Sequence, residues 1–320
     1  MPILASTYQP ALFFKSAHIA TIYPNLFRSV RNVKQIRERL ELQDGDFLDL
    51  DWSFAKSKKS KHLTLILHGL EGNAQRPYMK GLTKQMTSNN IDAVAINLRN
   101  CSNQPNRLYA SYHAGASDDL ALVVQHITSN YNYEKVSICG FSLGGNIVLK
   151  YLGETEHIPS IVKSAVAISV PCDLHDSLQQ IEKPFNFIYR NRFIRHLKTK
   201  LLQRAKDFPN SISHQQIRAC KSLMDIDDLY TSRAHGFLNA EDYYLKCSSK
   251  NLLSQIALPT LILNAKNDSF LGTSCYPIDE AQANPKLYLE MPEFGGHVGF
   301  YDSDGSYYHE LRAYQFISRF

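Results

Sequence analysis

The chain has 320 residues, 44% of them hydrophobic, and its 35 basic and 30 acidic residues give a formal net charge of +5. This length and composition allow a full hydrophobic core, and so small a charge excess does not indicate a nucleic-acid partner. No apolar run approaches the roughly 20 residues that a membrane-spanning helix requires, and residues 1–20 lack the pattern of a secretory signal. Six scattered cysteines without metal-type spacing fit a reducing compartment, so we expect a cytoplasmic protein.

The pattern of apolar residues predicts a sheet flanked by helices. Residues 47–54 alternate between apolar and polar types, which predicts a strand with one exposed face. Short continuous apolar runs then predict parallel strands that are buried on both faces; they lie at 63–67, 93–96, 136–139, 165–168 and 260–263, and a last strand is expected at 286–291. Helical patterns between most of these runs lie at 77–88, 116–128 and 144–152. The alternation indicates an α/β fold with a mostly parallel, doubly wound sheet.

Between residues 173 and 254 this alternation stops, and apolar residues such as Ile194, Leu197 and Leu201 recur at helical spacing. We therefore predict a single α/β domain over 1–320 with a helical cap insertion at about 173–254. Within it, residues 183–206 contain eight basic residues and no acidic one. That charge predicts either a lid helix with a solvated polar face or a basic face in weak peripheral contact with an anionic membrane.

The local motif that points most directly to chemistry is Gly140-Phe141-Ser142-Leu143-Gly144. This GxSxG motif follows a predicted strand and opens a predicted helix, the context in which it forms a nucleophile turn. The turn raises the Ser142 hydroxyl above the sheet, and its glycines are needed because a Cβ at either position would crowd the serine. The N–H of Leu143 then lies at a helix N-terminus, where it can bind a developing oxyanion. The non-catalytic alternative is an ordinary Gly/Ser turn.

A second loop, His68-Gly69-Leu70-Glu71-Gly72, directly follows the predicted strand at 63–67. In sheets that carry a nucleophile turn, the loop after this strand supplies the second oxyanion donor, which we assign to the backbone N–H of Leu70. His68 precedes the turn that must approach the substrate, so we expect it to organise the loop. His68 and His113 are the candidates for pocket-lining side chains.

A serine hydroxyl needs a neighbouring base, and we assign that role to His297. It lies in Phe294-Gly295-Gly296-His297-Val298-Gly299-Phe300, a glycine-rich loop after the last predicted strand, from which an imidazole can reach the serine. His113 is the next candidate among the 12 histidines.

The acid that orients this histidine is predicted to be Asp268. It follows the predicted strand at 260–263 and so lies at the same end of the sheet as Ser142. Asp173, just past the strand at 165–168, is the alternative. The chain order serine, aspartate, histidine is that of the α/β hydrolases.

These motifs together resemble the YheT-like α/β-hydrolase family, bacterial esterases that are related to eukaryotic lipid esterases and phospholipases. The resemblance covers nearly the whole chain and rests on the segments at 18–21, 43–47, 68–72, 105–107, 112–115, 140–146, 234–236, 242–244, 265–268 and 295–300. It implies that Ser142, Asp268 and His297 form the catalytic triad. Departures from the family pattern at Ala20, Ala114 and Asn267 leave all three in place.

We therefore predict a serine hydrolase that cleaves carboxylic esters with short- to medium-chain acyl groups, lipid esters among them, through an acyl-enzyme on Ser142. The expected partner is a small-molecule ester, with no metal and no cofactor, because the sequence has no HExxH, Walker or GxGxxG motif. The alternatives are an acyltransferase or thioesterase on the same fold, and a non-catalytic binding protein that retains the fold.

Overall fold

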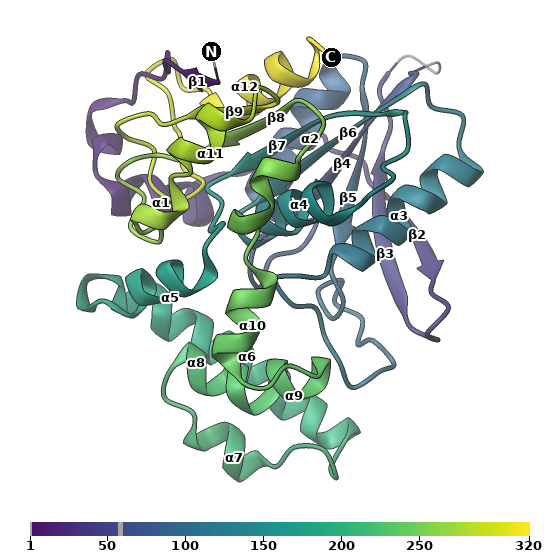
Figure 1. Cartoon of the computed structure of the whole chain (residues 1–320), viewed down its shortest axis with the longest axis vertical. Helices are drawn as coiled ribbons and strands as arrows, with labels where there is room; N and C mark the ends of the chain where they lie inside the picture. Colours follow the sequence, from purple (N-terminus) through teal and green to yellow (C-terminus); the bar gives the residue numbers. More distant parts are fainter. Residues whose placement is uncertain (1, 57–59) are drawn as a thin grey trace.

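The computed structural model describes residues 2–56 and 60–320. In this part of the chain a nine-stranded sheet runs in the order β1-β9-β8-β7-β6-β4-β5-β3-β2, with helices on both faces (Figure 1). The strands are β1 (Ile3–Leu4), β2 (Ile36–Glu41), β3 (Phe47–Ser53), β4 (His62–Leu67), β5 (Asp92–Asn97), β6 (Lys135–Phe141), β7 (Val162–Ile168), β8 (Thr260–Leu263) and β9 (Leu287–Glu290). β2 and β3 are antiparallel to their neighbours and the other pairings are parallel, as the apolar runs predict.

The helices include some that connect consecutive strands and others that come from the two ends of the chain. The α-helices are α1 (Ala17–Phe27), α2 (Pro77–Ser88), α3 (Ser117–Asn130), α4 (Leu143–Glu154), α5 (Leu174–Glu182), α6 (Phe187–Asp207), α7 (His214–Ala219), α8 (Leu223–Ile226), α9 (Ser232–His235), α10 (Ala240–Cys247), α11 (Ile278–Ala283) and α12 (Tyr308–Ile317). Short turns of other helix types are η1 (Leu12–Lys15), η2 (Pro184–Asn186), the π-helical η3 (Asp227–Thr231), η4 (Lys250–Gln255) and η5 (Thr273–Cys275). No helix within the described ranges has the length and hydropathy to cross a bilayer. The sequence at 56–61 is a basic run whose composition predicts a solvated turn between two strands; residues 57–59 of it lie outside the described residues.

Successive strand residues supply two cores, one on each face of the sheet. Leu65 and Ile138 pack with residues of α3 and α4, whereas Ile66 and Val166 pack with residues of α2 and α12. The burial of both faces explains why the central strands are continuously apolar.

The prediction that the strand at 47–54 has one exposed face is wrong. Every residue of β3 is buried, because arginines of the edge strand β2 cover its polar face. Arg37 Nε lies 2.7 Å from Asp51 Oδ1, and Arg39 Nε lies 2.8 Å from Asp49 Oδ1. The polar alternation therefore marks buried ion pairs and not a solvated surface.

Helices α5–α10 fill the chain between β7 and β8 and form the lower part of the molecule in Figure 1. They have a small core of their own, which includes Leu201 and Ile217. The expectation that the basic residues of this segment all face outward is wrong for Lys200 and Arg204. Both lie one or two turns from Leu197 on the side of α6 that faces the α/β body, and Arg204 Nη1 donates to the carbonyl of Asn106 at 2.8 Å.

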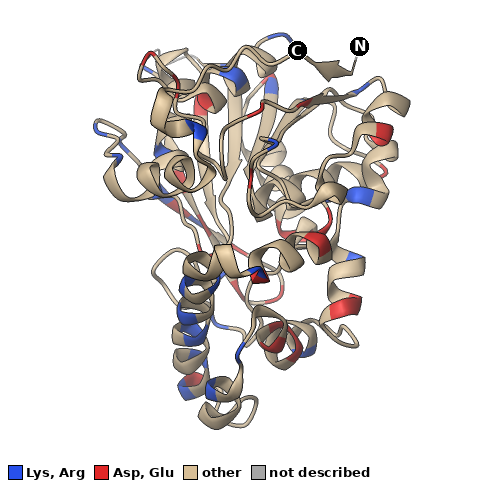
Figure 2. Cartoon of the chain, turned by 90° about the vertical axis from the view of Figure 1, so that its left-hand side faces the viewer, with Lys and Arg blue, Asp and Glu red and all other residues tan. Residues whose placement is uncertain are grey.

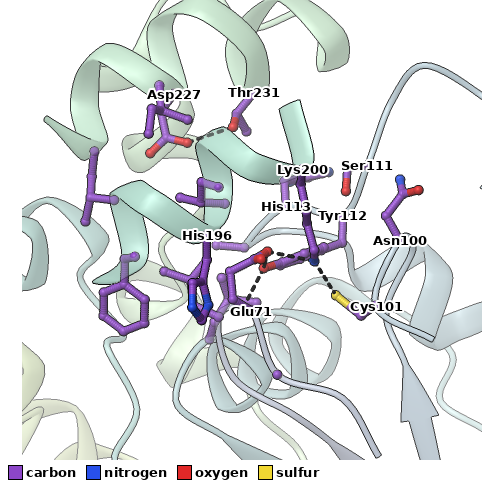
Figure 3. Close-up of a pocket in the computed structure, with 18 of the residues that line it drawn as sticks. Glu71, Asn100, Cys101, Ser111, Tyr112, His113, His196, Lys200, Asp227 and Thr231 are labelled. Carbon is purple, nitrogen blue, oxygen red and sulfur yellow. Dashed lines mark hydrogen bonds and ion pairs between the residues drawn. The ribbon is translucent and has the colours of Figure 1, made fainter. Parts of the chain in front are cut away.

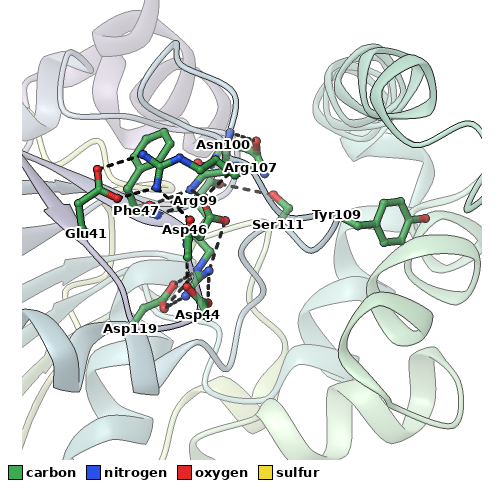
Figure 4. Close-up of polar contacts among 12 residues, drawn as sticks. Glu41, Asp44, Asp46, Phe47, Arg99, Asn100, Arg107, Tyr109, Ser111 and Asp119 are labelled. Atoms are coloured by element: carbon green, nitrogen blue, oxygen red, sulfur yellow. Dashed lines mark hydrogen bonds and ion pairs between the residues drawn. The ribbon is translucent and has the colours of Figure 1, made fainter.

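A charged network holds the loop after β5 against the start of β3 (Figure 4). Arg99 Nη1 lies 2.7 Å from Asp44 Oδ2 and 3.4 Å from Asp46 Oδ2, and its Nη2 lies 2.7 Å from Asp119 Oδ1. The fully buried Asp46 also accepts a hydrogen bond from Asn106 Nδ2 at 2.7 Å. These contacts fix the start of a loop that forms one wall of the site described below.

Replacement of Arg99 tests this network. Arg99→Met would leave the carboxylates of Asp46 and Asp119 without their cation, so we expect a loss of about 3–5 kcal/mol in the free energy of unfolding. Urea unfolding followed by circular dichroism measures it. The control is Arg107→Met, because the pair between Arg107 and Glu41 is exposed to solvent and should leave stability nearly unchanged. Equal effects of the two substitutions would contradict the assignment.

Candidate active site

The nucleophile turn lies where β6 ends and α4 begins. Ser142 has φ +52° and ψ −123°, a region that non-glycine residues rarely adopt. A Cβ at Gly140 would come within 2.4 Å of the Gly144 carbonyl oxygen, and one at Gly144 within 2.5 Å of the His68 carbonyl oxygen. Glycine is therefore required at both positions, but the physical reason differs from the predicted one: a Cβ would meet the backbone of α4 or of the end of β4 and not the serine.

The structure brings Ser142, His297 and Asp268 together. His297 Nε2 lies 2.9 Å from Ser142 Oγ, and His297 Nδ1 lies 2.8 Å from Asp268 Oδ2. A carboxylate can only accept, so Nδ1 carries the proton of the neutral ring and Nε2 is free to accept the serine proton. The Asp268 side chain is fully buried and its Oδ1 accepts from the N–H of Phe270, whose ring stacks on His297 at 4.3 Å.

The alternative acid, Asp173, has a structural role in the described part of the chain. Asp173 is the N-cap of α5, where its side chain accepts a hydrogen bond from the N–H of Asp176 at 3.1 Å. The geometry thus favours Asp268 as the orienting acid.

The two amides assigned to the oxyanion belong to different elements, and both residues line the cavity beside the nucleophile. Leu143 is the first residue of α4, and Leu70 follows Gly69, where a Cβ would come within 2.9 Å of the Ser142 Cβ. Neither N–H has a hydrogen-bond partner among the described residues. Two free donors beside a serine hydroxyl are what an oxyanion site requires.

Glu71 connects the loop after β4, which carries the Leu70 amide, to α6 (Figure 3). Its buried carboxylate accepts from the Tyr112 hydroxyl and from Lys200 Nζ, both at 2.9 Å. Its backbone N–H donates to the Tyr112 oxygen at 2.8 Å, and Arg76 Nη2 donates to its carbonyl at 2.8 Å. Because Glu71 directly follows Leu70, these contacts anchor the loop on one side of the Leu70 amide, and the Gly69 carbonyl of the same peptide unit accepts from His68 Nδ1 and from the Gly72 N–H.

Ser142 and His297 open onto a cavity of about 750 Å³. Its wall is mostly apolar and comes from the loops at 70–76 and 100–114, from α5, α6, α8, η3 and α10, and from Phe270. Leu197 and Leu201 of the predicted stripe line it, as do the basic side chains Lys200 and Arg204. This volume is in the usual range for small-molecule sites.

Of the two histidines predicted to line the pocket, only His113 does so. Burial lowers its pKa to about 3, and the neighbouring His235, Lys150 and Arg99 add to the effect. His68 lies beneath the loop because its ring is used to hold the backbone: Nε2 accepts from the N–H of Leu98 at 3.1 Å and Nδ1 donates to the Gly69 carbonyl at 2.8 Å. Burial lowers the pKa of His68 to about 4, so it stays neutral in its predicted role as loop organiser.

Two residues with no role predicted from the sequence support the site. The Thr21 hydroxyl on α1 accepts the backbone N–H of His297 at 2.9 Å and donates to the Ala17 carbonyl at 2.7 Å. Buried Asn146 donates to the carbonyls of Ala114 and Cys247, and so joins α4 to the pocket wall and to α10. The sequence signal that could have pointed to Thr21 and Asn146 is that each lies in a segment that carries the family resemblance.

Comparison with known proteins identifies the family. Residues 64–304 match the family model described as the alpha/beta hydrolase fold. The Escherichia coli (strain K12) protein named "Putative esterase YheT" is 33% identical over 300 residues, which cover 92% of this chain and 87% of that protein. The chain belongs to the YheT-like α/β hydrolases. It is a hydrolase of the esterase and lipase type.

Other relatives of this hydrolase are more distant. It is 25% identical to phospholipase ABHD3 of Mus musculus over 93% of its own length and 74% of the phospholipase. It is 29% identical to monoacylglycerol lipase of Saccharomyces cerevisiae over 77% of its own length and 56% of the lipase. The solved structure of the esterase Pf2001 from Pyrococcus furiosus shares the fold, with a TM-score of 0.60 and 15% identity over 92% of this chain and 96% of that one.

The two candidate acids can be separated by substitution. Asp268→Asn should keep the fold but lower kcat by about 10³ to 10⁴, because an amide in this position favours the wrong tautomer of His297. Asp173→Asn should have little effect, because asparagine caps a helix as well as aspartate does. The measurement is steady-state hydrolysis of a p-nitrophenyl ester by both variants. A larger loss for Asp173→Asn would overturn the assignment.

Proposed function

We propose that this hydrolase cleaves carboxylic esters through a covalent acyl-enzyme on Ser142. The observation that carries the proposal is the continuous chain of hydrogen bonds from Ser142 through His297 to Asp268. The amides of Leu70 and Leu143, which have no hydrogen-bond partner in the described part of the chain, and the cavity next to them support the same reaction.

The reaction follows from the roles of these groups. Ser142 Oγ attacks the ester carbonyl carbon and His297 Nε2 takes its proton. The oxyanion that forms accepts hydrogen bonds from the amides of Leu70 and Leu143, while Asp268 stabilises the charged imidazole. His297 then returns the proton to the leaving alcohol as the C–O bond breaks. Water attacks the acyl-enzyme by the same steps in reverse and releases the acid.

The cavity supports esters with short- to medium-chain acyl groups, lipid esters among them. Its wall is mostly apolar, so an acyl chain loses contact with water there without leaving polar groups unpaired. The side chains of α6 that line it, such as Leu197, would then set the preferred chain length.

Labelling with a fluorophosphonate tests the nucleophile. An activated serine attacks phosphorus, so we expect Ser142 alone to be labelled, and Ser142→Ala should lose labelling and about 10³-fold or more in kcat. Ser137→Ala, which changes a buried serine on β6, the strand that precedes the nucleophile turn, should keep both. Labelling of the Ser142→Ala variant would remove Ser142 from its role, and the same assay with added alcohols and thiols shows whether water is the preferred acceptor.

Trimming the cap tests the acyl site. Leu197→Ala should shift the preference in kcat/KM towards longer p-nitrophenyl esters, by roughly 0.8 kcal/mol for each methylene that gains a buried position. Leu202→Ala is the matched control, because Leu202 packs within the cap core and does not line the cavity. An unchanged chain-length profile for Leu197→Ala would place the acyl chain elsewhere.

A further inference from the structure

Charge is distributed very unevenly along this chain. Residues 1–37 contain five basic residues and no acidic one, and residues 183–206 contain eight and none. These two segments thus hold 13 of the 35 basic residues, and the rest of the chain has 22 basic against 30 acidic residues. Figure 2 shows part of this asymmetry as a row of basic residues along one long helix of the lower part. Four of these 13 basic residues form ion pairs with acidic residues outside the two segments: Arg28, Arg37, Arg190 and Lys200.

The same two segments expose large apolar side chains. Of the 17 large hydrophobic residues that are exposed in the described part of the chain, nine lie in 12–27 and 185–188. Phe13 is 75% exposed, Phe27 69% and Phe187 52%. The full set is Leu12, Phe13, Ile19, Tyr23, Leu26, Phe27, Phe185, Phe187 and Ile188. So many apolar side chains within 20 residues exceed the scattered exposure that is normal for a protein surface.

The two segments adjoin each other and the active site. His18 Nδ1 lies 3.0 Å from the Tyr189 hydroxyl, and the His18 ring lies 6.4 Å from that of Phe185. The Tyr189 ring packs edge-on against Phe270 at 4.8 Å, and Phe270 stacks on His297. The exposed apolar segments are therefore connected, by packing through the buried rings of Tyr189 and Phe270, with the wall of the catalytic centre.

We infer that the apolar residues of 12–27 and 185–188, called here the docking face, insert into the headgroup region of an anionic lipid bilayer. The cations of both segments that are neither paired with acidic residues nor turned towards the α/β body, Arg192, Arg195 and Lys198 among them, would contact the lipid headgroups, since each basic residue near an anionic surface adds to the attraction. A second copy of the chain fits the same face less well, because a symmetric contact would bring two strongly cationic surfaces together. The inference rests on the proposed function only in one respect: the docked enzyme would take its ester from the lipid surface.

Vesicle sedimentation tests the docking face. The full chain is mixed with phosphatidylcholine vesicles, with or without phosphatidylserine, at low salt. Wild type should bind the vesicles that contain phosphatidylserine more tightly, and added salt should weaken binding. The double variant Phe13→Ser/Phe187→Ser should bind at least about tenfold more weakly, because two phenylalanines no longer enter the apolar layer. The matched control is Phe54→Ser/Leu238→Ser, which changes two side chains exposed elsewhere and should bind like wild type.

A second set of variants tests the cations. Arg192→Gln, Arg195→Gln and Lys198→Gln together should weaken binding by about fivefold for each charge removed. All these variants should hydrolyse a soluble p-nitrophenyl ester like wild type, and Ser142→Ala should bind vesicles normally. Failure of the docking inference is thus distinguishable from failure of the proposed reaction.

Two results would overturn the inference. The first is equal vesicle binding by wild type and by Phe13→Ser/Phe187→Ser, or no binding by wild type at low salt. The second is a wild-type dimer in analytical ultracentrifugation that the same double variant dissociates, which would make this face a contact between copies of the chain.

Discussion

The strained backbone at Ser142 is the constraint around which the site is built. A non-glycine residue in this region costs about 1–3 kcal/mol, so the surrounding structure must hold it. The N–H of Ser142 donates to the Ile168 carbonyl at 2.8 Å, and its own carbonyl accepts from the N–H of Asn146 at 3.1 Å. One bond ties the turn to the neighbouring strand and the other to the following helix. The missing side chains at Gly140 and Gly144 let the backbones approach closely enough for both.

Similar strain recurs in the loops that surround the serine. Glu71, Ser169 and Val298 also have positive φ angles, and they follow β4, β7 and β9 at the edge of the sheet where β6 ends. The Ser169 hydroxyl accepts the N–H of Val298 at 2.9 Å, which joins the end of β7 to the loop that carries His297. Parallel strands bring their carboxyl ends to one edge, and here each such loop is held by contacts with another. The geometry of the site therefore depends on several loops adopting their conformations together.

Much of this arrangement could be predicted from local patterns. Continuous apolar runs mark central strands because burial on both faces leaves no place for polar side chains. The triad was found because GxSxG, the aspartate after a strand and the glycine-rich histidine loop each have a local signal. The burial of β3 cannot be predicted locally, because Asp49 and Asp51 have the pattern of solvated residues and their partners, the arginines of β2, are identified only by the strand pairing.

Other features depend on contacts that no local pattern contains. Thr21 supports His297 across 276 residues of chain, and nothing near either residue indicates the pairing. Lys200 and Arg204 belong to a basic run that is typical of a solvated face, and only the seating of α6 over the cavity turns them inward. The docking face likewise joins two segments that are far apart in sequence and that adjoin through the contacts of His18 with Tyr189 and Phe185.

The central claim is the covalent intermediate, and mass spectrometry of the quenched enzyme tests it most directly. A p-nitrophenyl ester has a good leaving group, so acylation should outpace release of the acid and the acyl-enzyme should accumulate. Acid quenching during turnover, followed by proteolysis, should then find the acyl group on the peptide that contains Ser142. An acyl group on any other residue, or none on that peptide at any quench time, would contradict the account.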